Sequence, residues 1–322
     1  MIKKDLERKF CIAPMMGYTT PHARKLYRIL SKKAFLFTEM IPTKTLINSI
    51  KINQLIENNN QNPIALQVGG SDYKELEKCC KIAQNYNYDE INLNVGCPSK
   101  AVQKGSFGAC LMKKKYLVQE CLKVMINSCD KEVTLKCRIG INNQTSYDFF
   151  KDFIDVVVQS GIKVVYVHAR NAILNGLSPK NNRTIPPLKY EYVKKIKDDF
   201  PEVQFIINGG ITSLSQAYEL SKKYDGIMVG RLIQSNPFCL LDVDKTFFNE
   251  DTDKKNYQNI VFEYFNYIKQ KIDEDSIFRL LSPLLYIFFG VPNGKEFKSK
   301  IHQKIKNNDI DNLEKIFLQF IG

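Results

Sequence analysis

Residues 203–231 read VQFIINGGITSLSQAYELSKKYDGIMVGR, and this stretch decides the fold class. Two apolar runs, VQFIINGG (203–210) and DGIMVGR (225–231), lie on either side of a helical pattern over 213–223. A strand, a helix and a second strand in close succession predict a βαβ unit, in which the two strands are parallel.

Six similar runs precede this unit at wide spacing. They are FCIAPM (10–15), AFLFTEM (34–40), PIALQVG (63–69), DEINLNV (89–95), EVTLKCRIG (132–140) and KVVYVHAR (163–170). Helical patterns over 74–85, 116–128, 147–160 and 188–200 separate most of the runs. Eight strand–helix units in about 230 residues match a (β/α)8 TIM barrel in both count and length.

The main alternative is an open doubly wound sheet, which carries a G-x-G-x-x-G turn after its first strand. Here the first run continues as APMMG (13–17), so the barrel is favoured. After Pro237 the pattern changes to helices over 256–272, 275–289, 295–307 and 310–320. We therefore predict an α/β chain: a (β/α)8 barrel over 1–242, then a small C-terminal α-helical domain over 243–322.

The amino-acid composition limits the classes of partner and the cellular location that we expect. The net charge is +13, and residues 1–240 carry 35 Lys and Arg against 21 Asp and Glu. This surplus favours a polyanionic partner, although the general abundance of Lys and Asn weakens the inference. The chain has no long apolar run and no signal-peptide pattern, so we expect a cytoplasmic protein without a membrane span. Nine cysteines without a C-x-x-C pair, and only three histidines, predict reduced thiols and no metal site.

Polar side chains follow the strands at the end where a TIM barrel holds its active site. They comprise amides, cations, one histidine and one thiol: Gln67, Asn94, Cys97, Lys136, Arg138, His168, Arg170, Asn208 and Arg231. Glu39 is the only acid at a strand end, so a glycosidase with paired carboxylates is not expected.

The last two units resemble a phosphate site. Gly209 and Gly210 precede a helix, and Gly230-Arg231 follow the eighth run. Loops after strands 7 and 8 of such barrels often bind phosphate through backbone N–H groups. Each residue alone could be an ordinary turn glycine, a rim cation or a loop amide. Their convergence at one barrel end favours a planar cofactor with a phosphate, and flavin mononucleotide (FMN) is the natural candidate.

Several motifs together resemble the tRNA-dihydrouridine synthases. They are IAPMMGYT, LQVGG, INLNVGCPSKAVQKGSFGACLM, LKCRIGI, VHAR, INGGI and MVGR. The segment GLSPKNNRTIPPLKY (176–190) is similar to the A-type branch, which acts at positions 20 and 20a. The resemblance covers the barrel in order and continues more weakly into the helical domain.

This resemblance implies a flavoenzyme that reduces the C5=C6 bond of uridines in the D-loop of tRNA, with FMN as cofactor and NADPH as reductant. It implies that Cys97 is the general acid. The cofactor ligands that it implies are Pro14, Met15, Gln67, Lys136, His168, Asn208, Gly209, Gly210, Gly230 and Arg231. The substrate ligands are Asn94 and Arg183 beside the base, with Lys300 and Lys304 on the tRNA backbone.

The residue types suit this chemistry. Hydride from flavin N5 to C6 of the uracil leaves negative charge at C5, which an acid on the opposite face must protonate. A thiol with the ordinary pKa of roughly 8.5 is largely protonated at neutral pH and can donate. We expect Lys136 to stabilise the reduced flavin, and the loop over 99–108 to move when tRNA binds.

Two other functions stay open on the sequence. One is a flavoenzyme of the same fold that reduces a free pyrimidine, as dihydroorotate or dihydropyrimidine oxidoreductases do. The other is a non-catalytic RNA-binding protein that retains the barrel. We expect a monomer.

Overall fold

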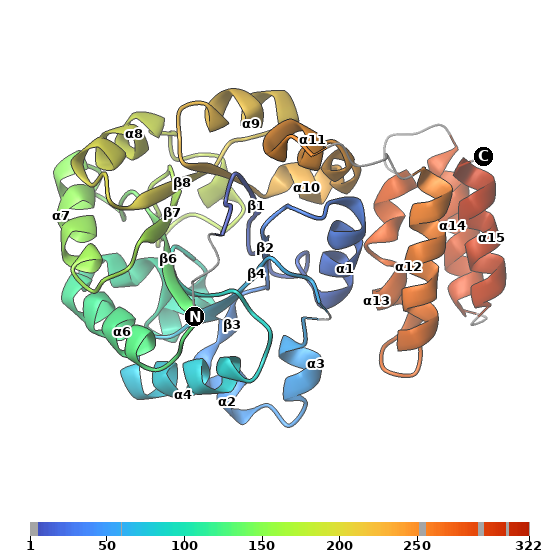
Figure 1. Cartoon of the computed structure of the whole chain (residues 1–322), viewed down its shortest axis with the longest axis horizontal. Coiled ribbons are helices and arrows are strands. Elements are labelled where there is room, and N and C mark those ends of the chain that lie inside the picture. Colours follow the sequence, from blue (N-terminus) through green and yellow to red (C-terminus); the bar gives the residue numbers. More distant parts are fainter. Residues whose placement is uncertain (1–5, 59, 251–255, 289–292, 307–308, 322) are drawn as a thin grey trace.

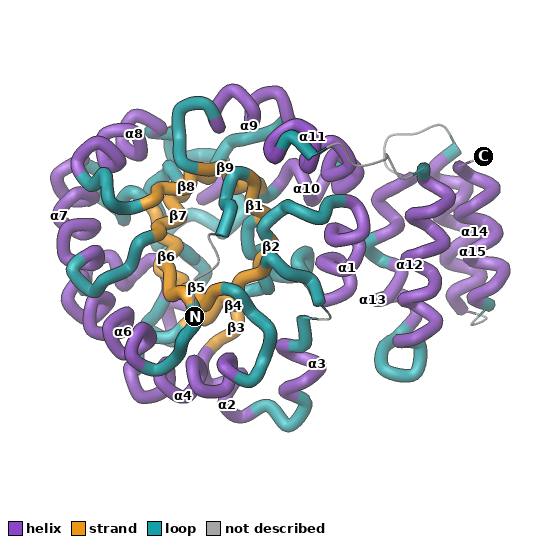
Figure 2. The backbone as a smooth tube through the Cα atoms, viewed as in Figure 1, coloured by secondary structure: helices purple, strands orange, loops and turns teal. Residues whose placement is uncertain are grey.

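A closed ring of eight parallel strands lies at the centre of the computed structural model (Figures 1 and 2), so the predicted TIM barrel is confirmed. The structure describes residues 6–58, 60–250, 256–288, 293–306 and 309–321. The strand order is β1-β9-β8-β7-β6-β5-β4-β2. A parallel bridge between Cys11 and Phe35 closes the ring between β1 and β2.

The strands begin close to the predicted runs. Their bounds are β1 Phe10–Ile12, β2 Leu36–Phe37, β3 Ile41–Pro42, β4 Ile64–Gly69, β5 Glu90–Val95, β6 Glu132–Arg138, β7 Val164–His168, β8 Gln204–Asn208 and β9 Gly226–Val229.

The second run, 34–40, is the exception, because only its middle forms a strand, β2, and an additional short strand, β3, follows the run. Both pair with β4, β2 at its start and β3 at its end. Between them the hydroxyl of Thr38 accepts the backbone N–H of Gln67 at 3.0 Å. A side-chain hydrogen bond thus replaces a backbone bond of the ladder and interrupts the strand.

Helices surround the ring (Figure 1). Those of the barrel are α1 Pro21–Leu30, α2 Thr43–Asn48, α3 Ile52–Ile56, α4 Tyr73–Gln84, α5 Lys100–Lys104, α6 Lys115–Asn127, α7 Tyr147–Val158, α8 Tyr190–Asp199, α9 Leu214–Ser221, α10 Arg231–Ser235 and α11 Val243–Phe248, with short 3-10 turns η1 Gly108–Lys113, η2 Asn181–Arg183 and η3 Pro237–Asp242. Side-chain N-caps mark several starts: Asp72 accepts from the backbone N–H of Glu75 at 3.0 Å, and Ser213 from that of Gln216 at 3.1 Å.

Two apolar layers hold the barrel together. One lies between strands and helices, and the other fills the ring itself, where Phe37, Tyr166 and Met228 are fully buried. At the N-terminal ends of the strands, an ion cluster replaces apolar packing. Arg8 donates to Glu90 at 2.8 Å and to Glu132 at 2.6 Å, inside the barrel floor.

The helical domain contains α12 Tyr257–Lys271, α13 Ile277–Leu281, η4 Leu284–Phe288, α14 Gly294–Lys306 and α15 Ile310–Ile321. The predicted single helix over 275–289 is wrong, because it is divided into α13 and η4, and residue 289 lies outside the described residues. Pro283 lies at the break, since proline lacks the N–H that a continuing helix requires. The aromatic pairs Phe265–Phe317 and Phe297–Phe320 pack α12 and α14 against α15.

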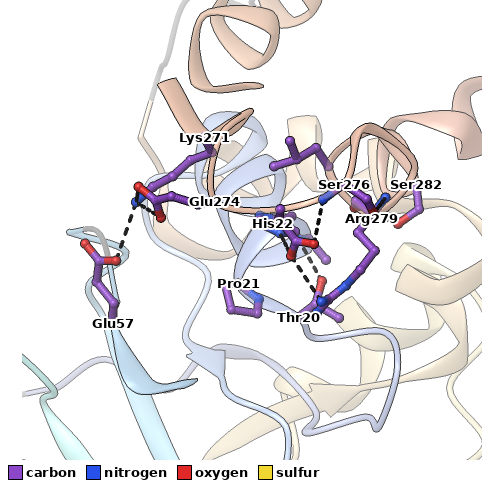
Figure 3. Close-up of polar contacts among 12 residues, drawn as sticks. Thr20, Pro21, His22, Glu57, Lys271, Glu274, Ser276, Arg279 and Ser282 are labelled. Carbon is purple, nitrogen blue, oxygen red and sulfur yellow. Dashed lines mark hydrogen bonds and ion pairs between the residues drawn. The ribbon is translucent and has the colours of Figure 1, made fainter. Parts of the chain in front are cut away.

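A polar interface joins the helical domain to the barrel beside α1 (Figures 1 and 3). His22 on α1 lies 2.7 Å from the hydroxyl of Tyr267 and 3.0 Å from Asp275. Lys271 lies between Glu274 and Glu57 of the barrel, at 2.8 and 3.6 Å (Figure 3). Within the described ranges, none of the helices has the length and apolarity needed to cross a membrane.

Candidate active site

The parallel register brings the predicted site residues together at the C-terminal ends of the strands. Asn94 on β5 pairs with Lys136 on β6, and His168 on β7 pairs with Asn208 on β8. Arg138 on β6 is the register partner of His168. Polar groups from four neighbouring strands therefore form one continuous rim.

Buried amides form the first part of this rim. Gln67, which is fully buried on β4, donates to Asn92 Oδ1 at 2.7 Å and accepts from Asn94 Nδ2 at 2.8 Å. Asn92 in turn donates to the hydroxyl of Thr134 at 2.7 Å. This chain fixes the orientation of each amide, so the rim is organised before any ligand binds.

Asn94 also positions the cysteine loop. Its Oδ1 accepts the backbone N–H groups of Gly96 and Cys97, at 3.1 and 3.0 Å. The Cys97 side chain is half-buried, with Sγ 3.6 Å from the hydroxyl of Ser99. Ser99 then caps α5, so the loop predicted to move contains a short helix in this structure. The thiol is thus partly exposed, and its backbone is held by Asn94.

Lys136 lies within the rim as a buried cation. Its Nζ donates to Asn208 Oδ1 at 3.1 Å, and Asn208 Nδ2 donates to the carbonyl of Met228 at 2.8 Å. Burial, and then the charge of Arg138, lower the pKa of Lys136 to about 8. The amine is thus still mostly protonated at neutral pH, and an anionic ligand would favour its charged form.

His168 is surrounded by positive charge. Burial lowers its pKa well below the usual value, and the charges of Arg138, Lys136, Arg170 and Arg231 lower it further. Each charged neighbour that shifts this pKa is a cation. The imidazole is therefore neutral and able to donate or accept a hydrogen bond, within a strongly positive environment.

The loops after β8 and β9 leave little room for side chains. Gly209 and Gly210 have φ angles of +115° and +71°, and a Cβ at Gly209 would lie 2.7 Å from the His168 ring. A Cβ on Gly230 would lie 3.4 Å from Met15 Sδ. Glycine at these positions lets the backbone pass close to whatever binds beside His168.

A buried donor lacks a partner in this region. Arg170 is 8% exposed, and its Nη1 donates to the carbonyl of Thr184 at 3.3 Å, but Nε has no hydrogen-bond partner among the described residues. Burial and the nearby charge of Arg231 lower the pKa of Arg170. An unpaired guanidinium N–H near a second cation, Arg231, is typical of a site for a phosphate or another anion.

Comparison with known proteins places the chain in a family. The family model described as dihydrouridine synthase (Dus) matches residues 11–321. The chain belongs to the dihydrouridine synthase family. The resemblance read from the sequence motifs is therefore confirmed.

Two relatives with the same name illustrate the similarity. The chain is 43% identical to the tRNA-dihydrouridine(20/20a) synthase of Salmonella typhimurium over 292 residues, 90% of this chain and 88% of that protein. It is 40% identical to the tRNA-dihydrouridine(20/20a) synthase of Shewanella oneidensis over 306 residues, 95% of this chain and 91% of that protein.

A solved structure supports the fold alone. The old yellow enzyme homologue from Zymomonas mobilis superposes with a TM-score of 0.51 at 13% sequence identity. The match covers 78% of this chain and 91% of that one. At this sequence identity the similarity supports the fold and carries no residue assignment.

Arg138 and Asn182 have structural roles in this family member that the sequence did not reveal. Arg138, 3% exposed, donates to the carbonyls of Gly96 and Asn171 and to that of Asn182, at 3.0, 2.9 and 2.9 Å. Asn182 is fully buried and bonds both backbone groups of Ile173, at 2.7 and 2.8 Å. Together they tie the cysteine loop to the segment over 173–186, which we name the β7–α8 loop.

The predicted substrate ligands lie at different distances from this rim. Arg183 is exposed on the β7–α8 loop, and its carbonyl accepts from Arg231 at 3.2 Å. Lys300 and Lys304 lie on α14 in the helical domain, away from the barrel (Figure 1). There Lys300 pairs with Glu296 at 2.8 Å and Lys304 with Asp309 at 3.3 Å. The residues forming the rim come together, whereas the two lysines belong to a separate surface.

Proposed function

We propose that this chain is an FMN-dependent tRNA-dihydrouridine synthase that uses NADPH as reductant and acts on uridines 20 and 20a of the tRNA D-loop. Family membership and the two relatives of that name support the reaction class. The observation that carries the proposal furthest is the neutral His168 among four cations, beside two glycines with positive φ. This arrangement suits a cofactor with a phosphate and a planar, hydrogen-bonding ring.

The residues suit both the phosphate group and the flavin ring of FMN. The unpaired Arg170 Nε, Arg231 and the glycine loops offer donors and space for a phosphate. Lys136, with a pKa of about 8, offers a charge that strengthens when negative charge develops beside it. The proposed cofactor ligands are Pro14, Met15, Gln67, Lys136, His168, Asn208, Gly209, Gly210, Gly230 and Arg231.

Reduced flavin, when bound, supplies a hydride to C6 of the uracil. The chain must then protonate C5, orient the base and exclude water. We assign the proton to the Cys97 thiol, because its backbone is fixed by Asn94 and it lies close enough to Lys136 and Arg138 to influence their pKa values. Arg138 holds the carbonyl of Gly96, which keeps the cysteine loop in place during the reaction.

We further propose that the helical domain over 243–322 binds the tRNA outside the barrel. The exposed Lys300 and the half-buried Lys304 of α14 would contact its phosphates. Asn94 and Arg183 would contact the target base, which must leave its stack to reach the rim. We expect the protein to act as a monomer.

The phosphate assignment can be tested by comparing FMN with riboflavin. Wild-type protein should bind FMN more tightly, and Arg231→Gln should lose at least about tenfold of that preference, since a charge-assisted hydrogen bond is worth about 1.5–3 kcal/mol. Fluorescence titration measures both affinities. Arg183→Gln, a change at an exposed arginine on the neighbouring loop, should keep the preference. An unchanged preference in Arg231→Gln would remove Arg231 from the phosphate site.

The role of Cys97 as general acid can be tested only by measuring turnover of tRNA. With NADPH and an unmodified tRNA transcript, Cys97→Ala should form dihydrouridine about 10²- to 10⁴-fold more slowly than wild type, the range of general acid catalysis. Bound flavin and its reduction by NADPH should persist. Cys110→Ala, which removes a half-buried thiol from the following 3-10 turn, should keep wild-type activity. Equal turnover of free uracil or orotate would instead favour a free-pyrimidine enzyme.

A further inference from the structure

The segment over 13–20, which we name the β1–α1 loop, joins β1 to α1 and contains the proposed flavin contacts Pro14 and Met15. Met15 is half-buried and packs against the apolar side chains that fill the ring. A Cβ on Gly230 would lie 3.4 Å from its Sδ, whereas the neighbouring Met16 is 63% exposed. The loop therefore presents Met15 to the rim, and the conformation of the loop decides where that side chain lies.

Thr19 holds Met15 through its hydroxyl group. Thr19 is fully buried, and its Oγ1 accepts the backbone N–H of Met15 at 3.0 Å and donates to the Met15 carbonyl at 3.2 Å. The backbone N–H of Thr19 donates to the same carbonyl at 2.9 Å. Both backbone groups of Met15 are thus bonded to one residue four positions along the chain, which closes the loop into a turn.

A buried arginine holds Thr19 in turn. Arg24 on α1 is 1% exposed, and its Nη1 donates to the Thr19 carbonyl at 2.7 Å, while its Nε donates to Gln61 Oε1 at 2.9 Å. Gln61 also donates to the carbonyl of Pro21 at 3.1 Å. Among the described residues no carboxylate pairs with this guanidinium, and Nη2 has no hydrogen-bond partner. Arg24 therefore anchors Thr19, and Thr19 anchors Met15.

Glu39 holds the same loop from the segment between β2 and β3. It is half-buried, and its Oε1 accepts the backbone N–H of Gly17 at 2.5 Å. The Glu39 carbonyl accepts the hydroxyl of Thr38 at 2.7 Å, and this hydroxyl also accepts the backbone N–H of Gln67 at 3.0 Å. The carboxylate thus connects the β1–α1 loop to the strand of Gln67, through a hydrogen bond that its charge strengthens.

We propose that Thr19 and Glu39 are positioning residues, which hold the β1–α1 loop so that Pro14 and Met15 meet the flavin ring in one fixed geometry. This role rests on the proposed function, because it needs a bound flavin. Both side chains act through backbone groups, those of Met15 and of Gly17, rather than through the flavin itself. A loop that is already held in its binding conformation loses less entropy when the ligand binds, so flavin affinity increases.

Thr19→Val and Thr19→Ser test the hydroxyl group. Valine keeps the shape of threonine and removes the hydroxyl, whereas serine keeps the hydroxyl. Thr19→Val should bind FMN at least about threefold more weakly than wild type, the loss expected for one neutral hydrogen bond, and Thr19→Ser should bind it like wild type. Fluorescence titration measures the affinity. The visible circular dichroism of bound FMN, which reports fixed contacts to the ring, should weaken in Thr19→Val and persist in Thr19→Ser.

The same measurements test Glu39. Glu39→Ala should lower FMN affinity at least about threefold, whereas Glu39→Gln, whose amide oxygen can still accept from Gly17, should lose less. Glu120→Ala, a change at an exposed carboxylate on α6, is the matched control and should bind FMN like wild type. Hydrogen exchange of the flavin-free protein adds a readout without the cofactor: the peptide over 13–20 should exchange faster in Thr19→Val and in Glu39→Ala.

The outcomes separate this role from the proposed function. Wild-type FMN affinity and dichroism in Thr19→Val or in Glu39→Ala would overturn the role of that residue. Equal losses in Thr19→Val and Thr19→Ser would assign the effect to packing and would also overturn the role of the hydroxyl. A wild-type protein that binds no FMN would instead refute the proposed function, and this role with it.

Discussion

Lys136 illustrates how the site departs from what stability alone would favour. A buried ammonium costs free energy, and here no carboxylate but an amide oxygen of Asn208 is its hydrogen-bond partner, at 3.1 Å. Arg138 adds like charge and lowers the pKa of Lys136 further. A protein retains such a group where a ligand provides the missing negative charge, so the cost belongs to the flavin-free state.

The pH dependence of stability tests this view of Lys136. Its pKa is lowered from 10.5 to about 8, so between these values the unfolded chain holds a proton that the folded chain has lost. Stability of the flavin-free protein should therefore rise with pH across this window, by roughly 3 kcal/mol relative to Lys136→Met. Below about pH 8 the difference between the two proteins should be constant. Urea unfolding at several pH values measures it, and a parallel pH dependence in both proteins would contradict the pKa shift.

At the residue scale, the sequence predicted which side chains gather but not how they pair. Strand-end positions identified Gln67, Lys136 and His168, because a barrel places all strand ends on one face. The fully buried Asn182 was not singled out, since its role depends on a loop conformation that has no sequence period. The Arg8–Glu90 pair was missed for a similar reason: the floor of the barrel joins residues 82 apart in the chain.

The β7–α8 loop, which overlaps the segment over 176–190, is tied to the loop of Cys97 through Arg138. Asn182 bonds both backbone groups of Ile173, and its own carbonyl accepts from Arg138. Arg138 also holds Gly96, next to Cys97. A conformational change in this loop can thus alter the position of the cysteine loop, because the Arg138 guanidinium bonds both.

Substitution of Asn182 should therefore loosen the loop. Asn182→Ala leaves the partly buried N–H and carbonyl of Ile173 without the Asn182 side chain as partner, which costs about 1–3 kcal/mol. We expect a lower melting temperature and faster proteolysis within residues 173–186. The exposed neighbour Asn181→Ala serves as the matched control and should behave as wild type. Equal protease sensitivity of the two variants would contradict the anchoring role.

Helix boundaries were predicted well where a capping side chain marks the first turn. Asp72 and Ser213 cap helices that were predicted within one residue of their starts. Prediction failed where a single side chain overrides the pattern. The hydroxyl of Thr38 follows the end of β2 inside the second run, before β3 begins, and Pro283 divides the helix predicted over 275–289.

At the scale of the molecule, the distribution of charge and the arrangement of the domains both bear on how tRNA binds. The positive surplus lies within residues 1–240, and the helical domain packs beside α1 through His22 and Tyr267. A tRNA that enters the barrel mouth would therefore meet a positive field before it meets specific contacts. The division of the chain at residues 242 and 243 stays a prediction, and α11, just after it, packs on the barrel through Phe247 and Phe10.

Salt dependence of tRNA binding tests the role of α14. The logarithm of the affinity should fall linearly with the logarithm of the salt concentration, and Lys300→Gln should reduce the slope by about 0.7–0.9 if Lys300 neutralises one phosphate. Glu296→Gln removes the partner of Lys300 at 2.8 Å and should leave the slope unchanged or steeper. Filter binding at several salt concentrations measures this. Identical slopes in all three proteins would remove Lys300 from the interface.

We propose that this barrel rim reduces specific uridines of tRNA with Cys97 as the proton donor. The most direct measurement maps dihydrouridine, position by position, in tRNA from cells that express the wild-type protein, Cys97→Ala or neither. We expect dihydrouridine at positions 20 and 20a with the wild-type protein alone. Unchanged dihydrouridine in cells without the protein, or full modification by Cys97→Ala, would contradict it.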